Sequence, residues 1–304
     1  QAVAKTIRAR LRHPLLVALT GTPLINQIED FRMIWQFLGW IDEKKPMREL
    51  MAKLEATGLT PADTGFFFEA RKAVISMGIV RRKKQDVAKD IPARRVADIP
   101  IELDGEAGRS IVEAERTLIA RLLERYDRVI KARGAESDEI DNDLVRLVAT
   151  SEIDETKQDD SGDNVFTLVR KIGQAKAVMA ADYTAQLARN VGKVVFFAKH
   201  IDVLDAAEAH FASVGITTTS IRGDQSSAQR QSAIDAFTND DTVQVIVCSL
   251  LAAGVGVNLQ AASNVVLAEL SWTSAEQTQA IDRVHRIGQE LPVTAWRIVA
   301  AQTV

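Results

Sequence analysis

Strands and helices alternate along the last third of the chain, and this alternation limits the folds open to it. Amphipathic helical patterns separate the strand-like segments, as in "HIDVLDAAEAHFASVG", where Ile201, Leu204 and Phe211 share one face. Strand–helix–strand units at this spacing require a parallel sheet that helices cover on both faces. We therefore expect an α/β lobe over about 190–304. Its expected strands, rich in β-branched and aromatic residues, are 193–198, 217–223, 243–250, 264–270 and 294–300.

The first 43 residues show part of the same pattern. The apolar run "LLVAL" (15–19) predicts a buried strand, and the turn "TGTP" (20–23) follows it. Short amphipathic helices are expected on either side, over 2–12 and around 28–38. Helix, strand, turn and helix in this order predict the end of another α/β domain over 1–43.

Residues 44–189 are expected to form a helical insertion region with two basic clusters, at 81–84 and 94–95. The stretch 136–163 carries eleven acidic and two basic residues, a net charge of −9, with Ser, Gly and Asn mixed in. Such a composition predicts a mobile, solvated segment.

Composition narrows the class of protein. The 304 residues carry a net charge of −3, so contact with a nucleic acid would depend on a local basic patch. Cys248 is the single cysteine and lies in an apolar run, which predicts a buried thiol in a reducing compartment. No run of 18 apolar residues is present, so no membrane partner is expected.

Two loops follow predicted strands and are expected at the carboxyl edge of a sheet, where open parallel sheets bind ligands. "TGTP" is the first, and "AAGVGVNLQAAS" (252–263) is the second. Gly254 and Gly256 carry no Cβ, so backbone N–H groups there can approach a phosphate closely. A tight turn without a ligand is the alternative, because the G-x-G pattern alone is common.

The segment "QAIDRVHRIGQ" (279–289) places Arg283 and Arg286 three residues apart on a helix predicted over 275–289. Two guanidinium groups side by side suit a phosphate, because each offers a planar fork of donors. On spacing alone, a solvated basic face is an equal alternative. His285 faces elsewhere on that helix and receives no catalytic role, and the sequence predicts no metal site.

These motifs in combination resemble a known family. "LTGTPLIN" (19–26), "GVGVNL" (254–259), Trp272 and "QAIDRVHRIGQ" occur in the order seen in Swi/Snf-type ATPases, double-stranded DNA translocases of helicase superfamily two. The resemblance covers most of the chain and is greatest to the annealing-helicase-like branch. It implies RecA-like lobes that clamp ATP: the end of a first lobe in 1–43 and the second lobe, the helicase C-terminal domain, in 190–304. Ala253 and Ser274 depart from the family's usual glycine and proline.

The resemblance also implies roles for single residues. Arg283 and Arg286 would be catalytic arginines that reach ATP phosphates across the cleft between lobes, and Gln279 would open their motif. Trp272 would lie at the DNA groove, with interface packing as the alternative. The remaining expected positions are Gly254 and Gly256 near the nucleotide, and Thr20, Gly21, Thr22 and Asn258 in loops that couple nucleotide state to DNA.

Two parts of an ATP site are absent from this sequence. No G-x-x-x-x-G-K-[ST] P-loop occurs, since the only Gly-Lys pair, Gly192-Lys193, is followed by Val194. The acidic pair Asp42-Glu43 follows "TGTP", whereas the family's magnesium-binding pair precedes it. ATP and Mg²⁺ would therefore be held mainly by an N-terminal part, and we expect little ATPase activity from this chain alone.

The main hypothesis is the C-terminal part of an ATP-dependent double-stranded DNA translocase. The alternative is a non-enzymatic DNA-binding or regulatory module that uses the 81–84 cluster. An RNA helicase is disfavoured, because those resemble "SAT" where this chain has "TGTP", and end the last motif in Gly-Arg where it has Gly288-Gln289. Expected partners are double-stranded or branched DNA and the N-terminal RecA-like lobe of the same protein, in the bacterial cytoplasm or nucleoid rather than a nucleus.

Overall fold

The computed structural model describes residues 91–103, 105–133, 165–251, 257–271 and 274–301, together with a few shorter stretches elsewhere. The chain divides into two compact units, Gln1–Lys89 and Asp90–Val304. In the first unit the described residues are scattered, so the strand and helices expected within 1–43 fall largely outside the described part of the chain.

The second unit is built around a six-stranded sheet, and every pair of neighbouring strands is parallel. This confirms the α/β class predicted from the sequence. The strand order is β1-β6-β5-β2-β4-β3. The strands are β1 (Arg94–Ile101), β2 (Val194–Ala198), β3 (Thr217–Ile221), β4 (Val243–Ser249), β5 (Asn264–Leu267) and β6 (Val293–Ala300), and the helices are α6 (Gly105–Arg133), α8 (Val165–Val191), α9 (Ile201–Ser213), α10 (Ser227–Asn239) and α11 (Ser274–Ile281).

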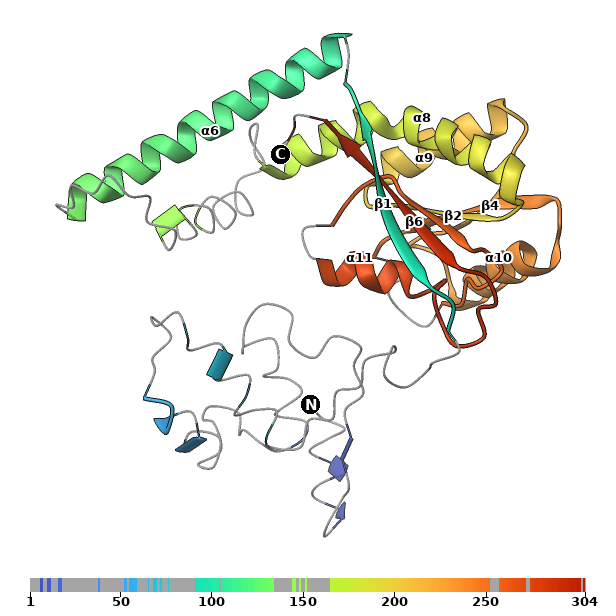
Figure 1. Ribbon diagram of the computed structural model, residues 1–304, viewed down its shortest axis with the longest axis horizontal. Helices are drawn as coiled ribbons and strands as arrows, with labels where there is room; N and C mark the ends of the chain where they lie inside the picture. Colours follow the sequence, from blue (N-terminus) through green and yellow to red (C-terminus); the bar gives the residue numbers. More distant parts are fainter. Residues whose placement is uncertain are drawn as a thin grey trace. The chain divides into compact units, whose positions relative to one another are not determined.

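Helices cover both faces of the sheet, with α8 and α9 on one face and α10 and α11 on the other (Figure 1). Side chains alternate along a strand, so neighbouring residues of β2 serve different faces. Phe196 packs in the cluster with α8 and α9, whereas Phe197 packs in the cluster with α10 and α11. Both rings are fully buried, so β2 lies in the centre of the core.

Small side chains bring α8 close to the sheet. Ala177, Ala181, Ala185 and Ala188 recur at helical spacing and are all buried. The stripe packs against β2 and α9 in one hydrophobic cluster. The helix therefore belongs to the core of the sheet unit, although it begins well before residue 190.

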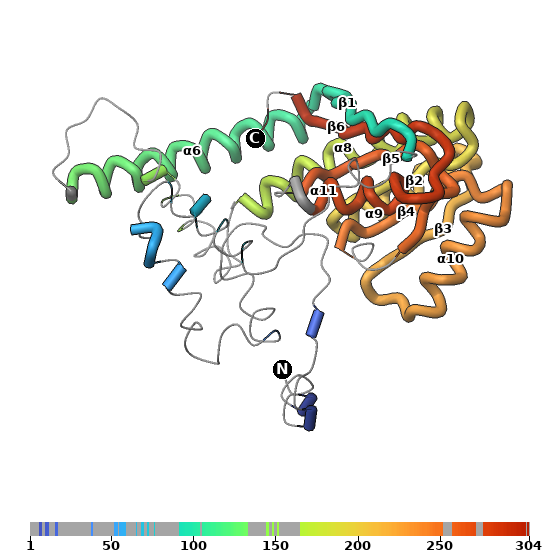
Figure 2. Tube along the Cα trace, turned by 60° about the horizontal axis from the view of Figure 1, so that its bottom comes forward, coloured from blue at the N-terminus to red at the C-terminus, as the bar shows by residue number. Residues whose placement is uncertain are grey.

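Strand β1 corrects the expectation of a helical insertion region over 44–189. It pairs with β6 in parallel, from Arg94 opposite Val293 to Ile101 opposite Ala300. Figure 2 shows the two strands side by side at one edge of the sheet. Its residues are alternately exposed and half-buried over most of its length, as suits an edge strand with one covered face.

Helix α6 extends away from the sheet in both views (Figures 1 and 2). Its first half packs on α8, where Ile111 and Leu118 meet Leu168 in a small apolar cluster. Part of the acidic stretch 136–163 is also ordered against the protein. Leu144 and Val148 are helical and buried, so the prediction of a solvated segment is wrong at these two positions.

Cys248 lies in β4 and is fully buried, as the sequence predicted. Burial raises the pKa of its thiol, because the thiolate would lose its hydration.

Among the helices that the structure describes, none combines the length and the apolar character needed to cross a membrane.

Candidate active site

The two arginines of "QAIDRVHRIGQ" lie beyond the end of a helix. Helix α11 ends at Ile281, and the sequence prediction of a helix to 289 is wrong in this respect. The next amides bond three residues back, from Arg283 N to Ala280 O at 3.1 Å and from Val284 N to Ile281 O at 3.0 Å. These tight turns form a segment, 282–289, that we call the arginine turn.

A second loop explains why the helix stops. The carbonyl of Arg283 accepts a hydrogen bond from Leu259 N at 3.0 Å, so it is used across the structure and not within a continuing helix. Gln260 Nε2 donates to the carbonyl of Ile287 at 2.6 Å. The guanidinium of Arg286 donates from Nη1 to the carbonyl of Val257 at 3.1 Å. The loop 257–262 and the arginine turn therefore form one hydrogen-bonded unit.

Asn258 lies in this unit, as the resemblance implied. Its neighbours Val257 and Leu259 are buried in the sheet cluster, whereas Asn258 itself is exposed. Its side-chain oxygen accepts a hydrogen bond from Gln260 N at 3.4 Å. The structure thus brings Asn258 together with the turn that carries Arg283 and Arg286. Gln279 is half-buried near the end of α11, four residues before Arg283.

Gln289 ties the loop to the turn, and sequence analysis did not assign it a role. The buried side chain donates from Nε2 to the carbonyls of Gln260 at 3.2 Å and Ala262 at 2.9 Å. Its Oε1 accepts from the amides of Glu290 and Leu291, both at 3.0 Å. Only a neutral amide offers donors and acceptors in this combination. In the sequence, the only indication of this role was the glutamine at the end of the motif, in the pair Gly288-Gln289.

The two arginines of the turn carry positive charges that act on each other. Burial lowers the pKa of Arg283, and the positive charge of Arg286 lowers it further, while Asp282 acts in the opposite direction. Both arginine side chains are half-buried. Two cationic groups that repel each other are stabilised by a negative group between them, and a phosphate has the matching shape and charge.

The position of this unit in the sheet differs from the expectation. The loop after β4 begins at the carboxyl edge, but its described half, 257–262, has already crossed to the amino end of β5. The arginine turn lies just before the amino end of β6. The described residues 257–262 and the arginine turn therefore lie toward the amino ends of β5 and β6, whereas 20–23 and 252–256, the parts expected at a carboxyl edge, lie outside the described residues.

Six predicted positions lie outside the described residues: Thr20, Gly21, Thr22, Gly254, Gly256 and Trp272.

The carboxyl edge holds a different polar cluster, which the sequence reading missed. Glu269, 2% exposed, follows β5 and accepts hydrogen bonds through Oε2 from the amides of Lys199 at 2.7 Å and His200 at 2.9 Å. Its Oε1 lies 2.6 Å from His200 Nδ1. A Cβ at Gly173 would overlap this carboxylate, so the close packing of α8 here requires glycine.

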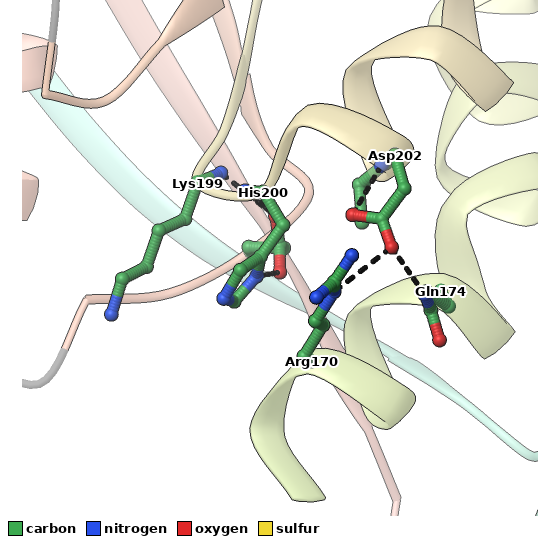
Figure 3. A network of polar contacts seen from close by, with 7 residues as sticks. Arg170, Gln174, Lys199, His200 and Asp202 are labelled. Carbon is green, nitrogen blue, oxygen red and sulfur yellow. Dashed lines mark hydrogen bonds and ion pairs between the residues drawn. The ribbon is translucent and has the colours of Figure 1, made fainter. Parts of the chain in front are cut away.

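Figure 3 shows the neighbouring contacts that join α8 to the start of α9. Arg170 and Gln174 both point toward Asp202, and Arg170 Nε donates to Oδ2 of Asp202 at 3.0 Å. Burial opposes ionisation, but the hydrogen bonds from Gln174 and Arg170 lower the pKa of Asp202 below its usual value. Carboxylates thus occupy the start of α9, and this cluster does not resemble a phosphate site.

No group of three or more His, Cys, Asp or Glu side chains suited to a metal ion occurs among the residues that the structure describes.

Comparisons with known proteins place this geometry in a family. The family described as helicase conserved C-terminal domain matches residues 175–288. An uncharacterized ATP-dependent helicase of Mycoplasma pneumoniae is 30% identical over 95% of this chain and 26% of its own length. The mouse SWI/SNF-related matrix-associated actin-dependent regulator of chromatin subfamily A member 1 is 25% identical over 94% of this chain and 27% of its own length.

Two further matches are shorter or more distant. The DNA repair protein rad8 of Schizosaccharomyces pombe is 38% identical over 37% of this chain and 11% of its own length. The crystal structure of the C-terminal part of the Fun30 ATPase domain is 17% identical, with a TM-score of 0.47, over 70% of this chain and 86% of that one.

The parallel sheet with helices on both faces, together with the match over 175–288, defines the second unit as a RecA-like helicase C-terminal lobe. The helicase C-terminal match over 175–288 and the relatives named ATP-dependent helicase and SWI/SNF-related regulator support the C-terminal part of a Swi/Snf-type ATPase of helicase superfamily two, as the motifs predicted. The chain spans about a quarter of the length of the relatives that match it nearly throughout.

Proposed function

We propose that this chain supplies the second half of the ATP site in an ATP-dependent double-stranded DNA translocase, with Arg283 and Arg286 contacting the phosphates. One observation carries the proposal: Arg283 and Arg286 belong to a turn that the loop 257–262 fixes by hydrogen bonds. Fixed cations of this kind stabilise the charge that develops during phosphoryl transfer, and an arginine finger contributes roughly 10³–10⁵ in rate.

The residues present fit the phosphates of ATP but not the whole nucleotide site. The arginine turn offers cationic donors, whereas this sequence contains no P-loop and the described residues offer no metal cluster. We propose that a P-loop-bearing lobe of the same protein holds most of the nucleotide and its Mg²⁺. Mg²⁺ would supply charge neutralisation at the phosphates when bound. The chain alone would then hydrolyse ATP slowly or not at all.

The proposed substrate for movement is double-stranded or branched DNA. Support comes from relatives named as a regulator of chromatin and a DNA repair protein. Asn258 is exposed beside the arginine turn, which suits a role in coupling nucleotide state to DNA. The roles proposed for Thr20, Gly21, Thr22, Gly254, Gly256 and Trp272 stay predictions, as does a location in the bacterial cytoplasm or nucleoid.

The test uses the complete protein, with its P-loop-bearing lobe, and measures DNA-stimulated ATP hydrolysis. Arg286→Ala and Arg283→Ala should each lower kcat about 10³-fold or more. Arg297→Ala is the matched control, because Arg297 pairs with Asp98 on the sheet surface and lies outside the site. An unchanged kcat in both arginine-turn variants would refute the arginine assignment. Salt-dependent DNA binding without any ATPase in the complete protein would favour the non-enzymatic module.

A further inference from the structure

The arginine turn is held from a second side by the residues that lead into β1. This lead-in segment, 91–94, makes three contacts with the end of the lobe. His285 Nε2 lies 2.8 Å from the carbonyl oxygen of Pro92. Val293 N donates to the carbonyl of Ala93 at 2.9 Å. Arg94 Nη1 contacts Asp282 Oδ1 at 3.5 Å.

The bond from His285 has a defined direction. A carbonyl oxygen only accepts hydrogen bonds, so Nε2 of His285 carries the proton and donates it. His285 is buried, 8% exposed, so water has little access to replace this partner. Of the three contacts, this one is a buried side-chain bond made by the arginine turn itself, whereas the Arg94–Asp282 pair is partly exposed.

His285 lies between the two arginines in the chain, two residues after Arg283 and one before Arg286. Val284 beside it is fully buried in the sheet cluster, which prevents the turn from shifting toward the sheet. On one side the turn bonds to 257–260, and on the other His285 bonds to the lead-in segment. The guanidinium positions therefore depend on both sets of contacts.

We propose that His285 is a positioning residue, which fixes Arg283 and Arg286 by anchoring their turn to the carbonyl of Pro92. The lead-in segment directly follows the boundary between the units Gln1–Lys89 and Asp90–Val304. A change in backbone position at 91–93 thus acts on the arginine turn through this hydrogen bond. The inference rests on the proposed function of the two arginines.

The experiment compares two amides of different reach at this position in the complete protein. The Nε2 atom of Gln stands at about the distance of the histidine Nε2, so His285→Gln retains the donor to Pro92. The shorter side chain in His285→Asn does not reach it. His285→Asn should lower DNA-stimulated kcat by about 10- to 100-fold, since small misplacements of catalytic groups have effects of that size. The KM for ATP and the affinity for DNA should change less than about twofold, and His285→Gln should recover most of kcat.

Two further measurements separate positioning from loss of folding. Hydrogen exchange of the amides in 283–289, in this chain, should become faster in His285→Asn and stay slow in His285→Gln. His210→Ala is the control, because His210 pairs with Asp182 between α8 and α9, away from the turn. If His285→Asn does not fold, Arg94→Gln weakens the third contact, the partly exposed ion pair with Asp282, and should lower kcat several-fold with folding intact.

The outcomes distinguish the two proposals. If Arg283→Ala and Arg286→Ala abolish hydrolysis but His285→Asn and Arg94→Gln leave kcat unchanged, the positioning role is wrong and the arginine assignment stands. Equal losses in His285→Gln and His285→Asn, with both proteins folded, would also overturn the positioning role, because the donor to Pro92 would not matter. If the arginine variants retain full activity, the proposed function itself fails.

Discussion

At the scale of single residues, the arginine turn depends on a side chain that touches no expected ligand. Gln289 connects residues that are 27 to 29 positions apart in the chain. The disfavoured alternative, an RNA helicase, would have arginine in place of this glutamine. An arginine has only donors, so it could not accept from the amides of Glu290 and Leu291. The final glutamine is thus part of how this turn is built.

A charged isostere tests the contribution of Gln289. Gln289→Glu keeps the shape of the side chain but sets a carboxylate oxygen against the carbonyls of Gln260 and Ala262, where the amide donated. Loss of buried hydrogen bonds with an added buried charge should lower the free energy of unfolding by about 3 kcal/mol. Denaturant unfolding measures this. Gln231→Glu, at an exposed position of α10 beside Asp235, is the control and should cost no more than about 0.5 kcal/mol. A similar change in both variants would contradict the role of Gln289.

The sequence indicated residues of the candidate site but not their contacts. The spacing and resemblance pointed to Arg283, Arg286 and Asn258, and the structure brings their segments together. Gln289 and His285 could not be assigned, because their partners lie at 260, 262 and 92 and leave no local pattern. Hydrophobic periodicity reports which face of an element is buried, and it carries no information on such distant polar contacts.

At the scale of elements, the strands after residue 190 and the helices between them were predictable, whereas strand β1 was not. The strands expected at 193–198, 217–223, 243–250, 264–270 and 294–300 correspond to β2, β3, β4, β5 and β6 within a few residues. Strand β1 was missed because its sequence, RRVADIPI, contains charged residues and a proline. Proline is tolerated in an edge strand, and the partner of β1 lies almost 200 residues later.

The contact of α8 with β6 includes a lysine that is unusual in a core. Lys176 is 5% exposed, and its Nζ donates to the carbonyl of Ile298 at 2.6 Å. Burial lowers its pKa from 10.5 to about 8, although the negative charge of Glu269 acts in the opposite direction. Between pH 8 and pH 10.5 the unfolded chain therefore binds a proton that the folded chain has released. The unfolding free energy contributed by this group rises with pH across that window.

Replacing this lysine removes the pH dependence. Relative to Lys176→Met, the wild-type protein should gain up to about 3 kcal/mol in unfolding free energy from pH 8 to pH 10.5. Denaturant titrations at several pH values in this range measure the difference in unfolding free energy between the two proteins. The contributions of the other titrating groups are the same in both proteins and cancel in this difference. Lys131→Met on the exposed part of α6 serves as the control and should follow the wild type. If the Lys176→Met curve also runs parallel to wild type, the lysine does not titrate in this window.

At the scale of the whole molecule, the sheet unit is larger than the lobe expected from the sequence. The expected lobe began at about 190, where strand-like patterns become clear. Helix α8 and strand β1 come before this point, yet α8 supplies ten buried residues and β1 pairs with β6 along its full length. The buried face of α8 consists mainly of alanines with polar neighbours. Alanine allows a helix to lie close to a sheet but buries little apolar area, so its hydrophobic pattern is weak.

Three lengths of chain test where the folding unit begins. A piece covering 90–304 should unfold cooperatively, and Trp296 should report the transition, because its ring packs edge-on against Tyr183 of α8 at 5.9 Å. A piece covering 165–304 should fold with lower stability, since β6 loses β1 and Arg297 loses its bidentate partner Asp98.

A piece covering 190–304 should not fold, because one face of the sheet loses the helix that covers it. Apolar side chains on that face would be exposed to water. The lost stabilisation is on the order of 10 kcal/mol, comparable to the whole free energy of unfolding of a domain. Near-ultraviolet circular dichroism and denaturant unfolding of the three pieces measure the order of stability. Cooperative unfolding of 190–304 at the same denaturant midpoint as 90–304 would show instead that α8 and β1 are attachments to a lobe that is complete without them.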